Sequence, residues 1–386
     1  VGINPAQTRC GKLPMRAVQA LGYLHAVMRS SDSSAPSAPA ALSRRRILHL
    51  GAAGLLVAAG RASAQPAAVE RRGLTLAVGG KTSLPCLPLT IAEQLGYFRD
   101  EGVQVELQDH PGGGLAQQAL LQGRADVAVG GLEHPIMLRQ RGSNCRAFVQ
   151  LGRAPQLVFG VSTRALPEFR ALAQLRGRRV GITSTDSSSH WFAQRLLARA
   201  GLTPTEVEFV AVGTASTPVA ALREGRIDAL ADIDPAISLL EYRGDIRVVA
   251  DTRSLRGTQE VYGGPMPGAC LYAPDAFVLR HPQTVQALAN AVVRALKWLQ
   301  TAGPSDIVRV VPESHMHGDR SVYLSAFDKA REAMSPDGVA SDEGVAIAHR
   351  IVTQHLQAGA NPRATASGAS YTNDFARRAR QKYLAP

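Results

Sequence analysis

One eight-residue pattern occurs twice in the chain, and it constrains the fold more than any other feature. Residues 119–126 and 221–228 both read A-L-x-x-G-R-x-D, 102 residues apart. The flanking segments repeat as well, because the apolar stretches 74–78 and 179–182 are each followed by a polar loop and then by a segment with helical periodicity. The chain therefore contains two copies of one folding unit.

Each copy alternates short apolar segments that are typical of strands with amphipathic segments that are typical of helices. The first copy has strands at 74–78, 103–108 and 126–129 and helices at 89–95 and 115–122; the second has strands at 179–182, 207–212 and 228–231 and helices at 190–200 and 217–223. Strands that alternate with helices form parallel sheets with right-handed crossovers. We therefore predict an α/β protein built from two α/β lobes with a ligand cleft between them.

The segments outside the two copies predict how the lobes are joined. Residues 157–162 have the pattern of a strand that leaves the first lobe, and residues 269–273 that of a strand that returns to it, so that two crossings form a hinge. Residues 282–301 predict a helix with one buried face, and we assign it to the first lobe with further helices near 321–333, 341–357 and 373–383. A length of 386 residues suits two domains, which we place at 65–160 plus 265–386 and at 161–264.

The first 64 residues have the pattern of an upstream segment and an export signal. Three arginines at 44–46 precede an apolar run, residues 47–60, which is followed by Ala-Ser-Ala at 62–64. The run is too short to span a bilayer and has the order of a secretory signal, with a resemblance to the twin-arginine motif. We expect cleavage after Ala64 and a periplasmic location, with residues 1–42 ahead of the true start site; twin-arginine and Sec export both stay open, and a buried N-terminal helix is the alternative.

The basic charge of the chain does not indicate a nucleic-acid-binding protein. The formal net charge is +12, but residues 1–64 hold eight of the 43 Lys and Arg and one of the 31 Asp and Glu, which leaves a net of +5 for the rest. That excess is scattered and aromatic residues are 5% of the chain, whereas a nucleic-acid site gathers basic and aromatic side chains on one face. We expect no nucleic-acid partner.

No sequence motif indicates a catalytic centre or a bound cofactor. The strings G-x-S-x-G, H-E-x-x-H, C-x-x-C and G-x-G-x-x-G are absent. Cys86, Cys145 and Cys270 remain after the expected cleavage, and their spacing fits no metal site. An oxidising compartment permits one disulfide among the three, with the pairing left open. We expect no enzyme activity, no metal and no cofactor.

The loops at the carboxyl ends of the predicted strands are the candidate binding site. They are residues 79–88, 110–114 and 130–135 in the first copy and residues 183–189, 213–217 and 232–235 in the second. Open α/β sheets bind ligands at this edge. The candidate ligand-binding residues on and beside these loops are Lys81, Thr82, Ser83, Gly112, Gly113, Gly114, Glu133, His134, Thr185, Ser187, Ser188, Ser189, Trp191, Thr214, Ser216, Thr217, Asp232 and Asp234.

Most of these candidates have a second, structural interpretation. The hydroxyl-rich loop 183–189 precedes a helix, so it either caps that helix or holds an anion at its N-terminus; Asp186 would then have to point outward. The glycines allow close approach of the backbone to a ligand. The acids after the third strand of each copy (Glu133, Asp232 and Asp234) either receive a ligand amine or cap the next turn. Trp191 either stacks on a ligand or packs under its helix. Lys81 is either a cation in the cleft or a solvated residue.

Residues 87–103, which read L-P-L-T-I-A-E-Q-L-G-Y-F-R-D-E-G-V, resemble a known signature. It is the P-L-x-x-A-x-x-x-G-Y-F-x-x-E-G-L string of periplasmic substrate-binding proteins of ABC importers, in the sulfonate/nitrate/taurine and thiamine-precursor (SsuA/THI5-like, NMT1-like) group. The resemblance extends to residues 175–181, 225–234 and 277–298 and spans about 74–380. It implies a type II periplasmic-binding-protein fold that closes on a small molecule, acts as a monomer, and docks to a membrane permease and its ATPase.

The resemblance and the loops together predict the function. We expect an exported solute-binding protein that captures a small organic anion of the sulfonate or carboxylate type. Binding of a thiamine-pyrimidine precursor is the alternative. A pyrimidine-synthase-type enzyme is a further one, although the C-C-C-F-C motif of that branch is absent. A sensory module would need an attached membrane or signalling segment.

Overall fold

The computed structural model describes residues 68–356 and 370–384, so the expected export signal lies outside the described residues. The first sheet has the strand order β2-β1-β3-β10-β4. Its strands are β1 (Gly73–Gly79), β2 (Gln104–His110), β3 (Val127–Gly131), β4 (Cys145–Gln150) and β10 (Ala269–Pro274). The first strand lies parallel to both β2 and β3, while β10 runs antiparallel to both β3 and β4.

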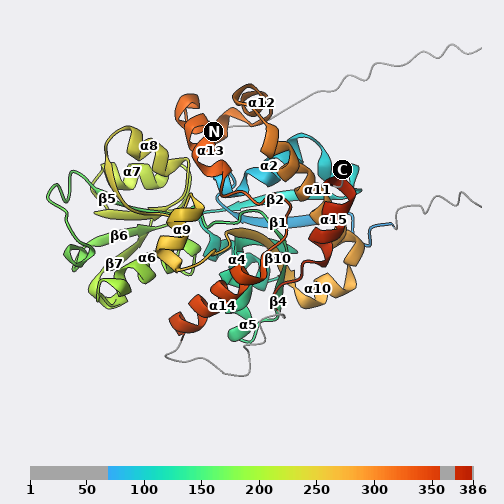
Figure 1. The fold of residues 1–386 in the computed structure, drawn as a ribbon, viewed down its shortest axis with the longest axis horizontal. Coiled ribbons are helices and arrows are strands. Elements are labelled where there is room, and N and C mark those ends of the chain that lie inside the picture. The colour runs from blue at the N-terminus through green and yellow to red at the C-terminus, as the bar shows by residue number, and fades with distance from the viewer. Residues whose placement is uncertain (1–67, 357–369, 385–386) are drawn as a thin grey trace, which may run out of the picture. The chain divides into compact units, whose positions relative to one another are not determined.

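The second sheet repeats this arrangement with the order β7-β6-β8-β5-β9. Figure 1 labels β5, β6 and β7 of this sheet. Its strands are β5 (Val158–Ser162), β6 (Arg179–Ile182), β7 (Glu208–Ala211), β8 (Ala229–Asp232) and β9 (Ile246–Asp251). Strand β6 is parallel to β7 and β8, and β5 is antiparallel to β8 and β9. Two α/β sheets are confirmed, but they are mixed rather than fully parallel, because β5 and β10, each of which follows a strand of the other sheet in the chain, run antiparallel to their neighbours.

The two copies of the sequence repeat have equivalent structural roles. Asp126 accepts a hydrogen bond from the Thr75 amide (3.0 Å) at the start of β1. Asp228 accepts one from the Arg179 amide (2.9 Å) at the start of β6. The repeat glycines, Gly123 and Gly225, follow helices and have φ values of 69° and 70°, a left-handed conformation in which glycine lacks the steric penalty of other residues. In each copy, the aspartate that ends the pattern therefore links the start of the third strand to the start of the first strand.

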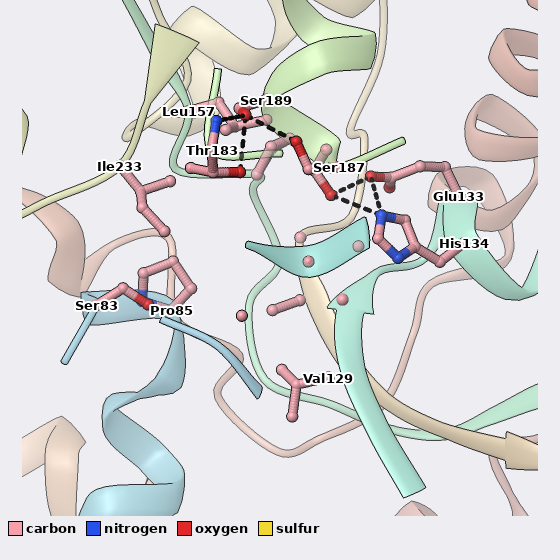
Figure 2. Close-up of a pocket in the computed structure, with 18 of the residues that line it drawn as sticks. Ser83, Pro85, Val129, Glu133, His134, Leu157, Thr183, Ser187, Ser189 and Ile233 are labelled. Carbon is pink, nitrogen blue, oxygen red and sulfur yellow. Dashed lines mark hydrogen bonds and ion pairs between the residues drawn. The ribbon is translucent and has the colours of Figure 1, made fainter. Parts of the chain in front are cut away.

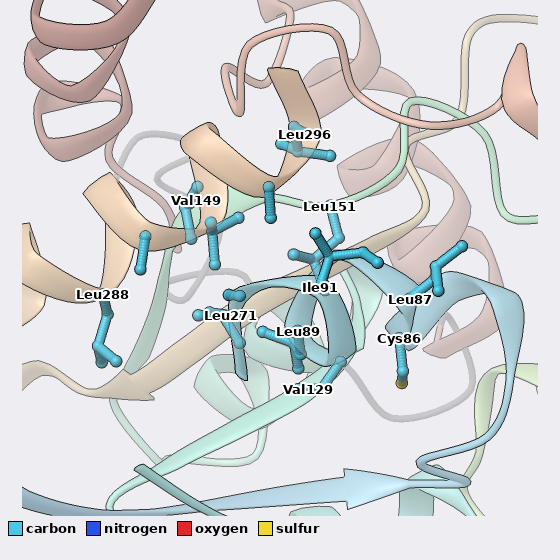
Figure 3. Packing of buried hydrophobic residues seen from close by; sticks show 14 of the residues in the cluster. Cys86, Leu87, Leu89, Ile91, Val129, Val149, Leu151, Leu271, Leu288 and Leu296 are labelled. Atoms are coloured by element: carbon cyan, nitrogen blue, oxygen red, sulfur yellow. The ribbon is translucent and has the colours of Figure 1, made fainter. Parts of the chain in front are cut away.

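Opposite faces of the first sheet pack against different helices. The Leu76 and Val78 side chains belong to a core cluster with α2 (Leu87–Gln94) and α11 (Pro282–Thr301), whereas Ala77 between them belongs to the cluster with α4 (Gly113–Leu121). This alternation is the period of two that a strand imposes. Figure 3 shows Leu288 and Leu296 of α11 packed with Leu271 of β10, and all three side chains are fully buried. Residues 282–301 therefore form the predicted helix, with the predicted buried face.

The remaining helices complete the covering of the two sheets. They are α3 (Tyr97–Asp100), α5 (Glu133–Gln140), α6 (Ser188–Arg199), α7 (Thr217–Arg223), α8 (Ala236–Tyr242), α9 (Leu255–Tyr262), α10 (Asp275–Arg280), α12 (Pro304–Val310), α13 (Arg320–Arg331), α14 (Asp342–Leu356) and α15 (Asp374–Leu384). Helix α13 touches both halves, because Phe327 packs in the cluster of α11 and Val322 in that of α8. None of the helices in the described ranges is long and apolar enough to cross a bilayer.

Candidate functional site

The strand ends of the two sheets face one another across a cavity of about 80 Å³ (Figure 2). The first sheet and its loops contribute Ser83, Pro85, Cys86, Gly113, Val129, Glu133 and His134; the second contributes Thr183, Ser187, Ser188, Ser189 and Ile233; the connecting segments add Pro155, Leu157, Tyr262, Met266 and Pro267. Both sheets lie within one compact unit. The cavity therefore occupies the edge at which α/β sheets bind ligands.

Direct hydrogen bonds beside the cavity join its two sides, which are the loops of the first sheet and the loops of the second sheet. The Gly114 amide donates to Ser184 Oγ (3.1 Å), and the Leu84 amide donates to the carbonyl of Asp234 (3.0 Å). A Cβ atom added to Gly114 would lie 1.9 Å from the carbonyl oxygen of Thr185. Glycine at position 114 therefore allows the backbones of the two sides to touch, and the structure shows the cleft closed.

A chain of buried side chains forms the polar corner of the cavity. Ser188 donates its hydroxyl hydrogen to Glu133 Oε1 (2.5 Å), and its oxygen lies 3.2 Å from His134 Nε2. The Tyr272 hydroxyl lies 3.4 Å from His134 Nδ1. Burial lowers the pKa of His134 despite the nearby Glu133 carboxylate, so the ring is neutral at pH 7. The two distances fit a His134 ring whose Nε2–H donates to the Ser188 oxygen and whose Nδ1 accepts from the Tyr272 hydroxyl.

The hydroxyls at the start of α6 bond mainly to one another. Ser189 Oγ lies 2.9 Å from Ser187 Oγ and 3.0 Å from Thr183 Oγ1. Ser187 is the N-cap and accepts from the His190 amide (3.3 Å). Among the described residues, the Ser188 and Ser189 amides have no hydrogen-bond acceptor. These amides and the positive end of the α6 dipole favour an anion at this position.

The structure brings seven of the expected site residues together at the cavity: Ser83, Gly113, Glu133, His134, Ser187, Ser188 and Ser189. Gly112 and Gly114 lie beside it, packed against Ser184 and Thr185 of the other side. Asp186 points away, as an anion site requires, and pairs with Arg141 at 3.6 Å. Lys81 pairs with Glu93 at 3.0 Å and does not line the cavity, and Thr185 is exposed.

A smaller cavity of about 10 Å³ collects four more of the expected residues, Thr82, Thr214, Asp232 and Asp234. The Oδ2 atom of Asp232 is buried there without a partner in the described residues. Burial and the neighbouring Asp234 raise the pKa of Asp232 to about 8. Asp234 instead pairs with Arg253 at 3.3 Å. These two acids lie in a separate polar pocket beside the main cavity.

Three expected residues lie elsewhere. Ser216 and Thr217 are exposed, and the Thr217 hydroxyl donates to the carbonyl of Thr214 (2.8 Å). Trp191 contacts His355 in a neighbouring chamber, with ring centroids 4.1 Å apart and ring planes tilted by 45°. Sequence reasoning missed the apolar lining from Tyr262 and Met266, which lie at the end of α9 and in the segment after it, outside the repeat. No periodic signal marked those two residues.

The cysteines of the described residues offer no reactive thiol. Cys86, Cys145 and Cys270 are all buried and unpaired. Burial raises the pKa of Cys86, which lines the cavity, to about 11. A thiol with a raised pKa is a poor nucleophile at neutral pH. In the same part of the chain, no group of three or more His, Cys, Asp or Glu is placed to hold a metal ion.

Comparison with known proteins identifies the family. Residues 85–304 match the sequence model described as NMT1/THI5 like. The chain belongs to this family. The putative aliphatic sulfonates-binding protein of Escherichia coli is 28% identical over 233 residues, which cover 58% of this chain and 68% of that protein. Membership agrees with the resemblance expected from residues 87–103.

Solved structures confirm the fold of this NMT1/THI5-like protein. A structure from Bordetella bronchiseptica RB50 is 43% identical, with a TM-score of 0.79, and the match covers 82% of this chain and 99% of that one. The alkanesulfonate-binding protein SsuA from Xanthomonas axonopodis pv. citri, bound to MOPS, is 18% identical with a TM-score of 0.60 and coverages of 79% and 100%. The predicted periplasmic-binding-protein fold is confirmed, and family and fold agree with a solute-binding role.

Proposed function

We propose that this protein is the exported solute-binding component of an ABC importer and that it captures a small organic anion of the sulfonate or carboxylate type. The observation that carries the proposal is the cavity of about 80 Å³, lined from both sheets at their strand ends. Capture needs only burial and hydrogen bonds, so no catalytic group is required. The sulfonate-binding names of the relatives support the ligand class, and the closed form would be the one presented to a permease and its ATPase.

The first turn of α6 is the proposed seat for the anionic group. Its Ser188 and Ser189 amides lack acceptors in the described residues, and the hydroxyls of Thr183 and Ser187 lie beside them. A carboxylate already contacts this seat, because Glu133 accepts the Ser188 hydroxyl hydrogen. An incoming anion would compete with Glu133 for that donor. Glu133 would therefore weaken the binding of an anion and strengthen the binding of a cation or of a neutral N–H donor.

A thiamine-pyrimidine precursor is the second candidate, and the same residue favours it. No Lys or Arg side chain in the described ranges lines the cavity, and Glu133 is its acceptor for a ligand N–H group. Tyr262, Met266 and Pro85 provide apolar surface for a flat ring. An aminopyrimidine would donate to Glu133 and gain from a charged acceptor.

Glu133→Gln separates the two candidates, because it keeps the size of the side chain and removes the charge. We would measure the binding of taurine, short carboxylates and an aminopyrimidine by thermal shift and calorimetry. For an anionic ligand the variant should bind about tenfold more tightly, since one repulsive charge is removed; for a pyrimidine it should bind about tenfold more weakly. Asp186→Asn is the matched control, because it removes an acid that pairs with Arg141 outside the cavity. Failure of every compound to bind either protein would overturn the proposal.

A further inference from the structure

A second chamber, of about 200 Å³, lies beside the ligand cavity on α6, α9 and α14. Its walls include Trp191, Phe192, Arg195, Val352 and His355. Four residues line both spaces: Glu133, Ser188, Tyr262 and Met266. The hydrogen bond from Ser188 to Glu133 therefore joins two residues that both spaces share.

Arg195 places a positive charge in the lining of this chamber. Its Nε atom is buried and has no hydrogen-bond partner among the described residues, and no described Asp or Glu is among the groups that act on its charge. The guanidinium lies over the ring of Tyr262, 5.5 Å from the centroid. A buried, unpartnered donor is rare in a native protein. Because the guanidinium stays protonated, a carboxylate or sulfonate would neutralise its charge and accept its hydrogen bonds.

The two arginines near Arg195, Arg199 and Arg350, add positive charge and do not neutralise its guanidinium. Burial lowers the pKa of Arg195, Tyr262 acts to raise it, and Arg199 and Arg350 act in the same direction as burial. Both of these arginines are already bonded, Arg199 to the carbonyl of Val261 (3.2 Å) and Arg350 to that of Tyr262 (3.3 Å).

None of the other described groups around the chamber forms an ion pair with Arg195. Burial lowers the pKa of His355, with help from His190 and Arg141, so this ring is neutral at pH 7. Arg141 pairs with Asp186. Glu133 is the acid of the lining, and its carboxylate is bonded to Ser188. The space beside Arg195 is therefore suited to an anionic group from outside the chain.

We infer that the chamber is a second subsite and that the solute is an extended organic diacid, with one acidic group at the first turn of α6 and the other on Arg195. The inference rests on the proposed function. Ser188 and Arg195 are seven residues apart, so they lie on one face of α6, about 10 Å apart along its axis. The arginine side chain leans back toward the N-terminus, which leaves room for acidic groups on the order of 5–10 Å apart. Trp191, Tyr262 and Met266 would contact the hydrocarbon between them.

The test compares diacids with monoacids of matched length on the whole purified protein. Adipate, pimelate and suberate are titrated by calorimetry against hexanoate, heptanoate and octanoate. The wild type should bind at least one diacid tenfold or more tightly than its monoacid partner. Arg195→Gln should remove that preference and leave the monoacid affinity unchanged, while Arg195→Lys, which keeps the charge, should restore part of it. Arg199→Gln is the matched control on the same helix and should behave as the wild type.

The outcomes separate this inference from the proposed function. Monoacids that bind as well as diacids, or a diacid preference that persists in a folded Arg195→Gln protein, would overturn the second subsite and leave anion capture intact. If neither series binds while an aminopyrimidine does, anion capture itself fails and the inference fails with it. Thermal melting of each variant establishes that it is folded before its binding is compared.

Discussion

Closure of the cleft depends on the absence of a side chain at position 114. Gly114 lies in the first turn of α4, and an added Cβ would be 1.9 Å from the carbonyl oxygen of Thr185. Gly114→Ala would therefore hold the two sides apart by more than an ångström and break the hydrogen bond from the Gly114 amide to Ser184. The lost bond costs about 1 kcal/mol and the overpacking about 1–3 kcal/mol. Together these predict a loss of ligand affinity of roughly 30- to 700-fold, at 1.4 kcal/mol for each factor of ten.

The structure supplies a matched control for this substitution. A Cβ on the adjacent Gly113 would lie 3.4 Å from the His134 ring and 4.0 Å from the Cβ of Ser187, which are both ordinary contacts, so the cleft of Gly113→Ala should still close. Alanine favours the helical state by about 1 kcal/mol over glycine, so Gly114→Ala should melt no lower than the wild type without ligand. Calorimetry would measure affinity, and small-angle scattering with and without ligand would measure closure. Wild-type affinity and wild-type compaction in a folded Gly114→Ala protein would refute the reasoning.

Two further predictions concern stability. Arg253→Met leaves the buried Asp234 carboxylate without its cation, so it should lower the free energy of unfolding in urea by about 3–5 kcal/mol. Arg256→Ala removes a largely exposed pair and should change the free energy of unfolding by less than about 0.5 kcal/mol; equal effects of the two substitutions would contradict this. The pKa of Asp232 is raised to about 8 from 3.8, so the folded state holds a proton that the unfolded state releases, and stability is complete below about pH 4 and falls as the pH rises toward 8. Asp232→Asn should remove that decline, with no change near pH 4 and higher stability at pH 8; parallel pH profiles for the two proteins would show that Asp232 is not its source.

The sequence was sufficient to predict most strands and helices of the two copies, because their signals are local. The repeat placed β1, β3, β6 and β8, and the structure shows why: Asp126 and Asp228 each bond the first strand of their own copy. The outer strands β4 and β9 lie outside the repeated unit and were not predicted. The antiparallel direction of β5 and β10 was also missed, because the direction of a strand depends on which sheet it joins.

The residues that line the cavity between the two sheets could be predicted only in part from the sequence. The hydroxyls at the start of α6 lie at a strand end and before a helix, and both signals can be read locally. Trp191 is on the same helix, but whether it faces the cavity or the adjoining chamber depends on how α6 is rotated against α14. Tyr262 and Met266 reach the cavity from α9 and the segment after it, which no sequence period connects to the binding loops.

The amino-acid sequence by itself determined the family, the two α/β units and the edge of each sheet at which the cavity lies, because these follow from short-range patterns of apolar, glycine and hydroxyl residues. Only the tertiary structure decided that Ser188 meets Glu133 and His134, that Asp232 Oδ2 is buried without a partner in the described part of the chain, and that Arg195 lines a chamber beside the cavity. Those contacts join residues from different elements. They depend on how closely the two sides approach and how each helix is turned, and packing of the whole chain sets both.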